Sequence, residues 1–191
     1  MVNAYMEKTL IKVLRENFNP TWWEGDTFQN QNQIKELHSR INALNPKLVI
    51  DAGCANNIHK DKINNLIGFD AMPFPSADQH CTILDAKFNL NSADAVIAYG
   101  SIQYLDELVV RENLKKVISW LKPHGLLEMK VNGKYINGYI PPEEKDWWRY
   151  WWCYEHIDKF TTEFNLEFKI KPYSINTELG SRIFWTWKKP C

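Results

Sequence analysis

The stretch LVIDAGCANNIHKDKINNLIGFD, residues 48–70, is the strongest indication of the fold of this 191-residue chain. Two short apolar runs each end in an aspartate, Asp51 and Asp70, and a loop of small residues, 53–57, follows the first run. In open α/β sheets, ligands bind beyond the carboxyl ends of the strands, where such a loop lets them approach the backbone. Asp70 follows Asp51 by 19 residues, close to the roughly 20 expected between this loop and an acid that binds ribose hydroxyls. Aspartates also end strands as turn formers, so the spacing alone leaves both interpretations open.

Hydrophobic patterns along the rest of the chain alternate between helix and strand. Short apolar strands that are buried on both faces predict a mostly parallel sheet covered by helices, and the last two are close enough in sequence to pair as an antiparallel hairpin. The expected helices cover residues 4–18, a segment with Ile34, Leu37, Ile41 and Leu44, and residues 106–121 and 143–164. The expected strands cover 47–51, 65–70, 81–84, 94–98, 126–131, 166–175 and 182–188, with a turn at 122–125.

Two further motifs follow along the chain. LDAKFNLNSADAVIAYGSIQYL covers residues 84–105, and WLKPHGLLE covers residues 120–128. With the loop at 53–57, they resemble the class I S-adenosylmethionine-dependent methyltransferases over roughly residues 46–131, and the terminal strands fit that family's topology. The resemblance implies an α/β, Rossmann-like three-layer sandwich with a mostly parallel seven-stranded sheet and a C-terminal antiparallel hairpin. It also implies methyl transfer as the reaction and S-adenosyl-L-methionine as the cofactor.

We expect residues 1–191 to form a single methyltransferase-like domain, because the chain is long enough for one sizeable core and too short for two. Its parts would be an N-terminal helical segment (1–45), a cofactor-binding core (46–131), and a C-terminal part (132–191) with an aromatic-rich helix and the hairpin.

The resemblance assigns cofactor contacts residue by residue. Asp51 and Gly53 match the loop that holds the methionine end of the cofactor, and Asp70 matches the acid on the ribose hydroxyls. Asp85 matches the acid near the exocyclic amino group of adenine, with Ala86 beside it. For each aspartate the alternative is a helix cap or a turn.

The end of the fourth expected strand matches the part of the family's site that borders the sulfonium. Tyr99 and Gly100 fall there, and Gln103 lies just beyond them as a candidate substrate residue. For Tyr99 and Gln103 the alternative is ordinary packing.

The loop departs from the family's usual Gly-x-Gly-x-Gly pattern, because Ala55 and Asn57 stand at the second and third glycine positions. Ala55 adds one methyl group beside the cofactor, and asparagine adopts positive φ more readily than most residues. Only seven residues, 58–64, separate the loop from the second strand, and two prolines interrupt the segment after Asp70. We therefore expect a modified but usable loop, a very short helix after it, and no full helix after Asp70.

Charge and composition bear on the partners. The 23 Lys and Arg residues balance 23 Asp and Glu residues, whereas proteins that bind nucleic-acid phosphates usually carry a basic excess. Residues 99–102 also lack the Asn-Pro-Pro-Tyr pattern of methylases that act on base amino groups. We therefore expect a small-molecule or sugar-like acceptor and no DNA. The four cysteines form no close pair of the kind that binds zinc, and no apolar run approaches a membrane span, so we expect a cytoplasmic protein without metal or membrane.

Aromatic residues crowd the last quarter of the chain. Trp147, Trp148, Trp151 and Trp152 lie at offsets that form one stripe on the expected helix 143–164, and core packing requires a stripe of this kind. The alternative is a lid over the acceptor, because aromatic rings stack on planar or sugar groups. In that case Trp148 would contact the acceptor and Arg149 would hold an anionic group.

Methyl transfer from a sulfonium is an in-line displacement, so the protein mainly positions the reactants and excludes water. A base is needed only where the acceptor must lose a proton. His124, His156, Glu128 and Lys130 are candidates, but the sequence singles out none of them. A non-catalytic relative that keeps the fold for binding is the main alternative, and another enzyme on a Rossmann-like fold, such as a nicotinamide-dependent one, is a third.

Overall fold

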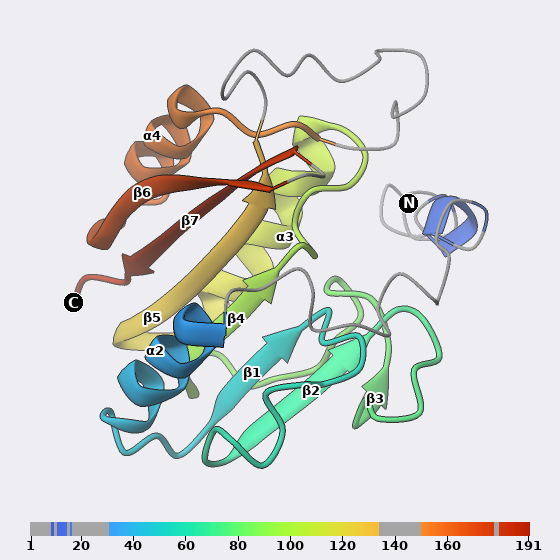
Figure 1. Ribbon diagram of the computed structural model, residues 1–191, viewed down its shortest axis with the longest axis vertical. Coiled ribbons are helices and arrows are strands. Elements are labelled where there is room, and N and C mark those ends of the chain that lie inside the picture. Colours follow the sequence, from blue (N-terminus) through green and yellow to red (C-terminus); the bar gives the residue numbers. More distant parts are fainter. Residues whose placement is uncertain (1–8, 10, 15, 17–30, 134–149, 178–179) are drawn as a thin grey trace.

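The computed structural model describes residues 9, 11–14, 16, 31–133, 150–177 and 180–191 (Figure 1). In this part of the chain, seven strands form one sheet in the order β3-β2-β1-β4-β5-β7-β6. The first five run parallel, and β7 pairs antiparallel with both β5 and β6. The strands are β1 (Val49–Ala52), β2 (Leu66–Asp70), β3 (Gln79–His80), β4 (Ala93–Tyr99), β5 (Leu121–Asn132), β6 (Glu167–Thr177) and β7 (Gly180–Lys188). The mostly parallel sheet and the C-terminal antiparallel hairpin are therefore confirmed.

Helices cover both faces of the sheet, which makes the three layers (Figure 1). On one face, Leu37 of α2 (Gln31–Asn42) belongs to a buried cluster with Ile97 of β4. On the other face, Val96 of the same strand joins a larger cluster with α3 (Glu107–Trp120) and α4 (Tyr154–Glu163). Successive side chains of a strand point to opposite faces, so the central strands are apolar on both sides. The described residues of the expected helix 4–18 are also helical.

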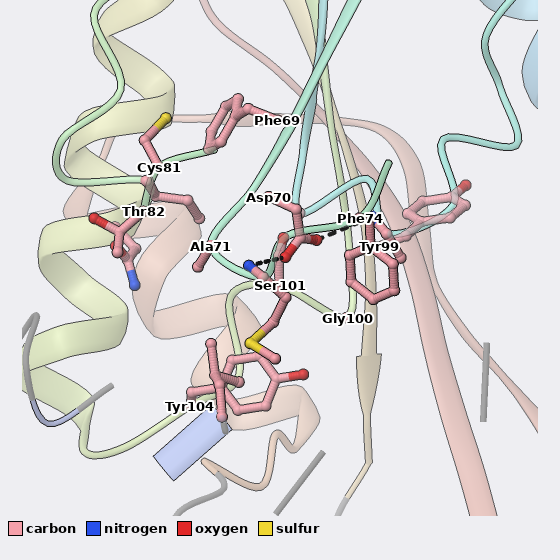
Figure 2. Close-up of a pocket in the computed structure, with 16 residues that line it drawn as sticks. Phe69, Asp70, Ala71, Phe74, Cys81, Thr82, Tyr99, Gly100, Ser101 and Tyr104 are labelled. Atoms are coloured by element: carbon pink, nitrogen blue, oxygen red, sulfur yellow. Dashed lines mark hydrogen bonds between the residues drawn. The ribbon is translucent and has the colours of Figure 1, made fainter. Parts of the chain in front are cut away.

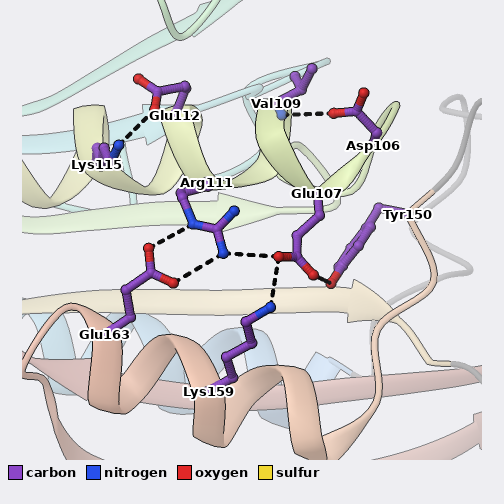
Figure 3. A network of polar contacts seen from close by, with 9 residues as sticks. All are labelled: Asp106, Glu107, Val109, Arg111, Glu112, Lys115, Tyr150, Lys159 and Glu163. Carbon is purple, nitrogen blue, oxygen red and sulfur yellow. Dashed lines mark hydrogen bonds and ion pairs between the residues drawn. The ribbon is translucent and has the colours of Figure 1, made fainter.

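A network of charges joins α3 to α4 (Figure 3). Arg111 of α3 donates to Glu163 of α4 at 2.6 Å and to Glu107 at 2.8 Å, and Lys159 of α4 donates to Glu107 at 2.7 Å. These two donors lower the pKa of Glu107 to about 2, with Lys159 contributing most. The hydroxyl of Tyr150 donates to the same carboxylate at 3.3 Å, so the network also holds the chain where it enters α4.

Two connections on the β1–β3 side of the sheet contain no helix. Residues 53–65 between β1 and β2 form turns, and residues 71–78 form the expected loop. The predicted short helix within residues 58–64 is wrong: Asp61, in the middle of this segment, is left-handed with φ of 62° and interrupts a right-handed helix. Ala55 and Asn57 before the segment and Asn65 after it are also left-handed, with φ of 45°, 50° and 56°.

The third strand lies earlier than predicted. β3 covers Gln79–His80 instead of residues 81–84, and residues 83–85 form a turn. The Thr82 hydroxyl donates to Asp85 at 2.8 Å, and the Ala86 N–H donates to the Thr82 carbonyl at 3.0 Å. Local bonds of this kind compete with the ladder of a sheet.

Other boundaries differ for equally local reasons. α2 ends at Asn42, so Leu44 lies beyond it and is 44% exposed. β5 begins at Leu121, and the expected turn at 122–125 is an irregularity inside this strand, where the residue paired with β4 changes from Leu121 to Leu126.

The aromatic stripe is only partly described. Trp147, Trp148 and Arg149 lie outside the described residues, and residues 150–153 are not helical, because α4 begins at Tyr154. The predicted helical stripe is therefore wrong at Trp151 and Trp152. Trp152 is nevertheless fully buried: it bridges to Gly133, and its indole N–H donates to the Ile102 carbonyl at 3.0 Å. This ring packs the core, as predicted, from an extended segment.

A buried ion pair fastens α2 to the sheet. Arg40 donates two bonds of 2.8 Å to Glu128 of β5, and the Thr186 hydroxyl of β7 donates a third at 2.8 Å. Glu128 is 1% exposed. Its charge is therefore tolerated only because these donors replace water.

We expect Arg40→Leu to lower the free energy of unfolding by on the order of 3–5 kcal/mol, because it leaves a buried carboxylate unpaired. Urea denaturation followed by tryptophan fluorescence measures the change. Lys115→Ala, which removes an exposed ion pair with Glu112, is the control and should have little effect. A loss no larger than that of the control would show that Arg40 does not neutralise Glu128.

Candidate functional site

A pocket lies at the carboxyl ends of β1, β2 and β4 (Figure 2). Its empty space, including the part that opens to solvent, is about 600 Å³. Its wall is mostly apolar, with few polar groups. The lining residues are Leu14, Gly53, Ala55, Phe69, Asp70, Ala71, Met72, Phe74, Cys81, Thr82, Ile83, Tyr99, Gly100, Ser101, Tyr104 and Asn113.

Asp70 is the charged residue of this lining. Its carboxylate accepts from the N–H of Ala55 at 2.9 Å and from the N–H of Met72 at 2.8 Å, one on each oxygen. Burial raises the pKa of Asp70, although the Met72 and Ala55 N–H groups oppose the rise. Each carboxylate oxygen has a second lone pair, so Asp70 can still accept hydrogen bonds from a ligand.

The loop after β1 keeps a glycine-like backbone at its substituted positions. Gly53 has φ of 81°, and a Cβ there would come within 2.4 Å of the Ser101 Cβ, so this position requires glycine. Ala55 adopts the left-handed region with φ of 45°, which costs an L-residue roughly 1–2 kcal/mol. Its N–H donates a hydrogen bond to Asp70. This bond favours the strained conformation and holds Ala55 in the wall of the pocket.

The end of β4 supplies another wall. Figure 2 shows Tyr99, Gly100 and Ser101 beside Asp70. The Tyr99 ring lies 5.2 Å from the Lys130 ammonium, and burial holds the pKa of Tyr99 well above its ordinary value, so its hydroxyl is neutral. The Ser101 hydroxyl oxygen is shielded from water and has no hydrogen-bond partner among the described residues. Buried polar atoms are rarely left unpaired, so the Ser101 hydroxyl has an unmet hydrogen bond beside the pocket.

Asp51 lies behind the lining and is 3% exposed. Burial, reinforced by the charge of Asp70, raises the pKa of Asp51 to about 7, while Lys130 opposes the rise. Burial likewise lowers the pKa of Lys130 to about 8. Two groups of opposite charge thus ionise near neutral pH beneath the pocket.

The two residues predicted beside adenine, Asp85 and Ala86, do not line the pocket. Asp85 is exposed and outside the lining, and Ala86 is buried behind it. Thr82, three residues earlier, lines the pocket instead and donates its hydroxyl proton to Asp85. Asp85 therefore touches the pocket through Thr82.

The predicted substrate residues are not brought together in the described chain. Gln103 is buried outside the lining, and its side-chain oxygen accepts from the Asn132 N–H at 2.7 Å. Trp148 and Arg149 lie outside the described residues. Among the residues that sequence reasoning missed, Ser101 directly follows Gly100 and could have been found from that position, whereas Asn113 of α3 gave no signal.

The described residues contain no group of three or more His, Cys, Asp or Glu side chains that could hold a metal ion. None of the helices in this part of the chain combines the length and the apolar character needed to cross a bilayer.

A scan against protein-family models finds no match to this chain, and a search of curated protein sequences finds none. Solved structures do match. The 1,6-didemethyltoxoflavin N1-methyltransferase of Burkholderia thailandensis, solved with 1,6-didemethyltoxoflavin and S-adenosylhomocysteine, is 12% identical with a TM-score of 0.71, over 97% of this chain and 91% of that one. The N-methyltransferase NodS of Bradyrhizobium japonicum WM9, in complex with S-adenosylhomocysteine, is 14% identical with a TM-score of 0.66, over 97% and 98% of the two chains.

The cyclase SpnF is similar in structure as well, with 13% identity and a TM-score of 0.64 over 88% of this chain and 85% of its own. At such identities the likeness concerns the fold. This chain has the fold of the class I S-adenosylmethionine-dependent methyltransferases, as its motifs predicted. Because a cyclase shares that fold, the reaction must be argued from the site.

The raised pKa of Asp51 predicts a pH dependence of stability. The unfolded chain releases this proton near pH 3.8, whereas the folded protein keeps it up to about pH 7. The folded state is therefore stabilised by the bound proton at low pH and loses that advantage as the pH rises from about 4 to 7. Asp51→Asn cannot ionise at this position. We therefore expect the free energy of unfolding of Asp51→Asn, minus that of the wild type, to be larger at pH 8 than at pH 5. Urea denaturation at both values measures this difference, and a constant difference would contradict the ionisation of Asp51.

Proposed function

We propose that this chain is an S-adenosyl-L-methionine-dependent methyltransferase that acts on a small-molecule acceptor. The observation that carries the proposal is the placement of Asp70. A buried carboxylate with unused lone pairs lies at the end of β2, inside a pocket, on this fold. An acid that lines an apolar pocket and keeps free lone pairs suits the ribose hydroxyls of a nucleoside.

The residues present fit an adenosyl group. Gly100, with φ of 78°, allows a ligand to approach the backbone of the loop after β4. The Thr82 hydroxyl donates a hydrogen bond to the Asp85 carboxylate and accepts one from the Asp85 N–H at 3.3 Å, so its second lone pair can accept from an exocyclic amino group. Above about pH 7, where it is ionised, Asp51 adds negative charge beside Asp70, which favours a cationic ligand. Ala86 and Gln103 would act indirectly, through Thr82 and the loop after β4.

When bound, S-adenosyl-L-methionine supplies a methyl group on a sulfonium that departs as a neutral thioether. Asp70 and Thr82 would fix the nucleoside, and the apolar wall, which includes Phe69 and Met72, would exclude water. Ser101, which lines the pocket, would lie beside the acceptor or the amino-acid end of the cofactor. The described lining contains no histidine, lysine or glutamate, so we assign no general base. This suits an acceptor that needs no proton removal before attack.

Two findings support a small acceptor. The chain carries no net charge, and the two methyltransferases compared above include one solved with a small heterocycle, 1,6-didemethyltoxoflavin. We place the protein in the cytoplasm, consistent with four free cysteine thiols.

A binding or scaffold protein on the same fold is the second candidate. The lack of a base in the described lining and the cyclase SpnF favour it. Transfer of a labelled methyl group to small acceptors discriminates the two candidates, because a binding protein would retain S-adenosylmethionine without turnover.

We expect Asp70→Ala to weaken the binding of S-adenosylhomocysteine at least tenfold, about 1.4 kcal/mol, because the ribose loses its acceptor. Isothermal titration measures the Kd. Asp94→Ala is the matched control, since Asp94 also accepts two backbone N–H bonds, from Lys47 and Leu48, before β1. Equal binding by the wild type and Asp70→Ala would remove Asp70 from the site. No binding by the wild type at millimolar ligand would leave the scaffold candidate in the lead.

A further inference from the structure

The two helix-free connections form neighbouring walls of the pocket. Ala55 lies in the first connection, and Met72 and Phe74 lie in the second, residues 71–78. With no helix in either segment, each wall depends on the contacts between them.

Asn57 is a buried link between these walls, beside a contact of 3.4 Å from the Ser76 hydroxyl to the Ala55 carbonyl. It stands at the third glycine position of the family's loop, and it is 4% exposed with φ of 50°. Its Nδ2 donates to the Ser76 carbonyl at 2.9 Å and makes a longer contact of 3.4 Å with Asp78 Oδ2. Both partners belong to the second connection, so a side chain absent from the family's usual loop holds that connection.

Gly68 of β2 makes room for this side chain. A Cβ at Gly68 would come within 2.7 Å of the Asn57 amide atoms. The Gly68 N–H donates to Asp78 Oδ2 at 2.9 Å, and the Asp78 N–H donates to the Gly68 carbonyl at 2.8 Å. Lys60 of the first connection forms an ion pair with Asp78. Strand and both connections therefore meet at one point.

The amide of Asn57 is more than a filler of this space. Its Oδ1 is buried without a hydrogen-bond partner among the described residues. An unsatisfied buried carbonyl is unfavourable, and an apolar side chain would avoid it. The hydrogen bond from Nδ2 to the Ser76 carbonyl therefore explains why this position carries an amide side chain instead of an apolar one.

We propose that Asn57 is a positioning residue that holds the 71–78 connection, and with it the Met72 and Phe74 wall of the pocket, in place of the missing helices. Asn57 acts through that wall and does not itself line the pocket. The effect on ligand affinity rests on the proposed function, whereas the effect on the connection does not.

The test uses Asn57→Gly, which restores the residue usual in the family and keeps the left-handed backbone accessible. We expect the Kd for S-adenosylhomocysteine to rise at least tenfold. In the unliganded protein, we expect faster hydrogen exchange at the backbone amides of Phe74 and Ala77, which bond within the second connection. Asn65→Gly is the matched control, because Asn65 is also left-handed but its side chain donates to the Pro46 carbonyl, away from the pocket.

The double variant Asn57→Gly/Gly68→Ala separates bonding from packing, because the new methyl group fills the space that the amide leaves. We expect it to recover thermal stability relative to Asn57→Gly, but to recover neither the affinity nor the slow exchange. Recovery of both by the double variant would overturn the proposal, since packing alone would then suffice. Wild-type affinity and exchange in Asn57→Gly would also overturn it. If the wild type binds no S-adenosylhomocysteine, the proposed function fails, and the exchange comparison alone decides the role of Asn57.

Discussion

The site depends on one carboxylate that accepts two backbone N–H bonds from different segments. Asp70 binds Ala55 of the loop after β1 and Met72 of the loop after β2, and so it sets both loops around the end of the sheet. A buried acid is tolerated there because the N–H groups replace part of its hydration. The same bonds favour the left-handed conformation of Ala55, which lets a non-glycine residue occupy a glycine position. Binding chemistry and loop structure therefore depend on the same atoms.

The trimmed half of the fold shows how side chains can replace secondary structure. The connections between parallel strands usually contain helices, yet residues 53–65 and 71–78 contain none. Asn57 and Asp78 supply the cross-links instead, and Gly68 provides the space. On the β5 side, the ion pair of Arg40 and Glu128 fastens α2 to the sheet. The large apolar cluster packs α3 and α4 against the sheet and also includes Phe69 of the pocket wall.

Particular elements show where sequence reasoning succeeded and failed. β1, β2, β4 and the terminal hairpin were predictable, because β-branched runs and turn residues are local signals. The adenine side was not: the motif pointed to Asp85, whereas Thr82 lines the pocket, because β3 ends early and a Thr82–Asp85 turn follows. Trp152 was expected on a helical stripe and lies instead in an extended segment. Its burial was predictable from its apolar character, and its backbone conformation was not.

The positions of most strands along the chain, and the acids that end the first two, can be predicted from the sequence alone, because residue patterns and spacing carry that information. Only the tertiary structure decided what those acids contact. Asp51 and Asp70 look alike as strand-ending residues, yet Asp70 lines the pocket and Asp51 lies buried behind it with a pKa raised to about 7. Lys130, which opposes the rise in the pKa of Asp51, is about 60 to 80 residues away from the two aspartates in sequence. Such long-range proximity is fixed only when the sheet assembles.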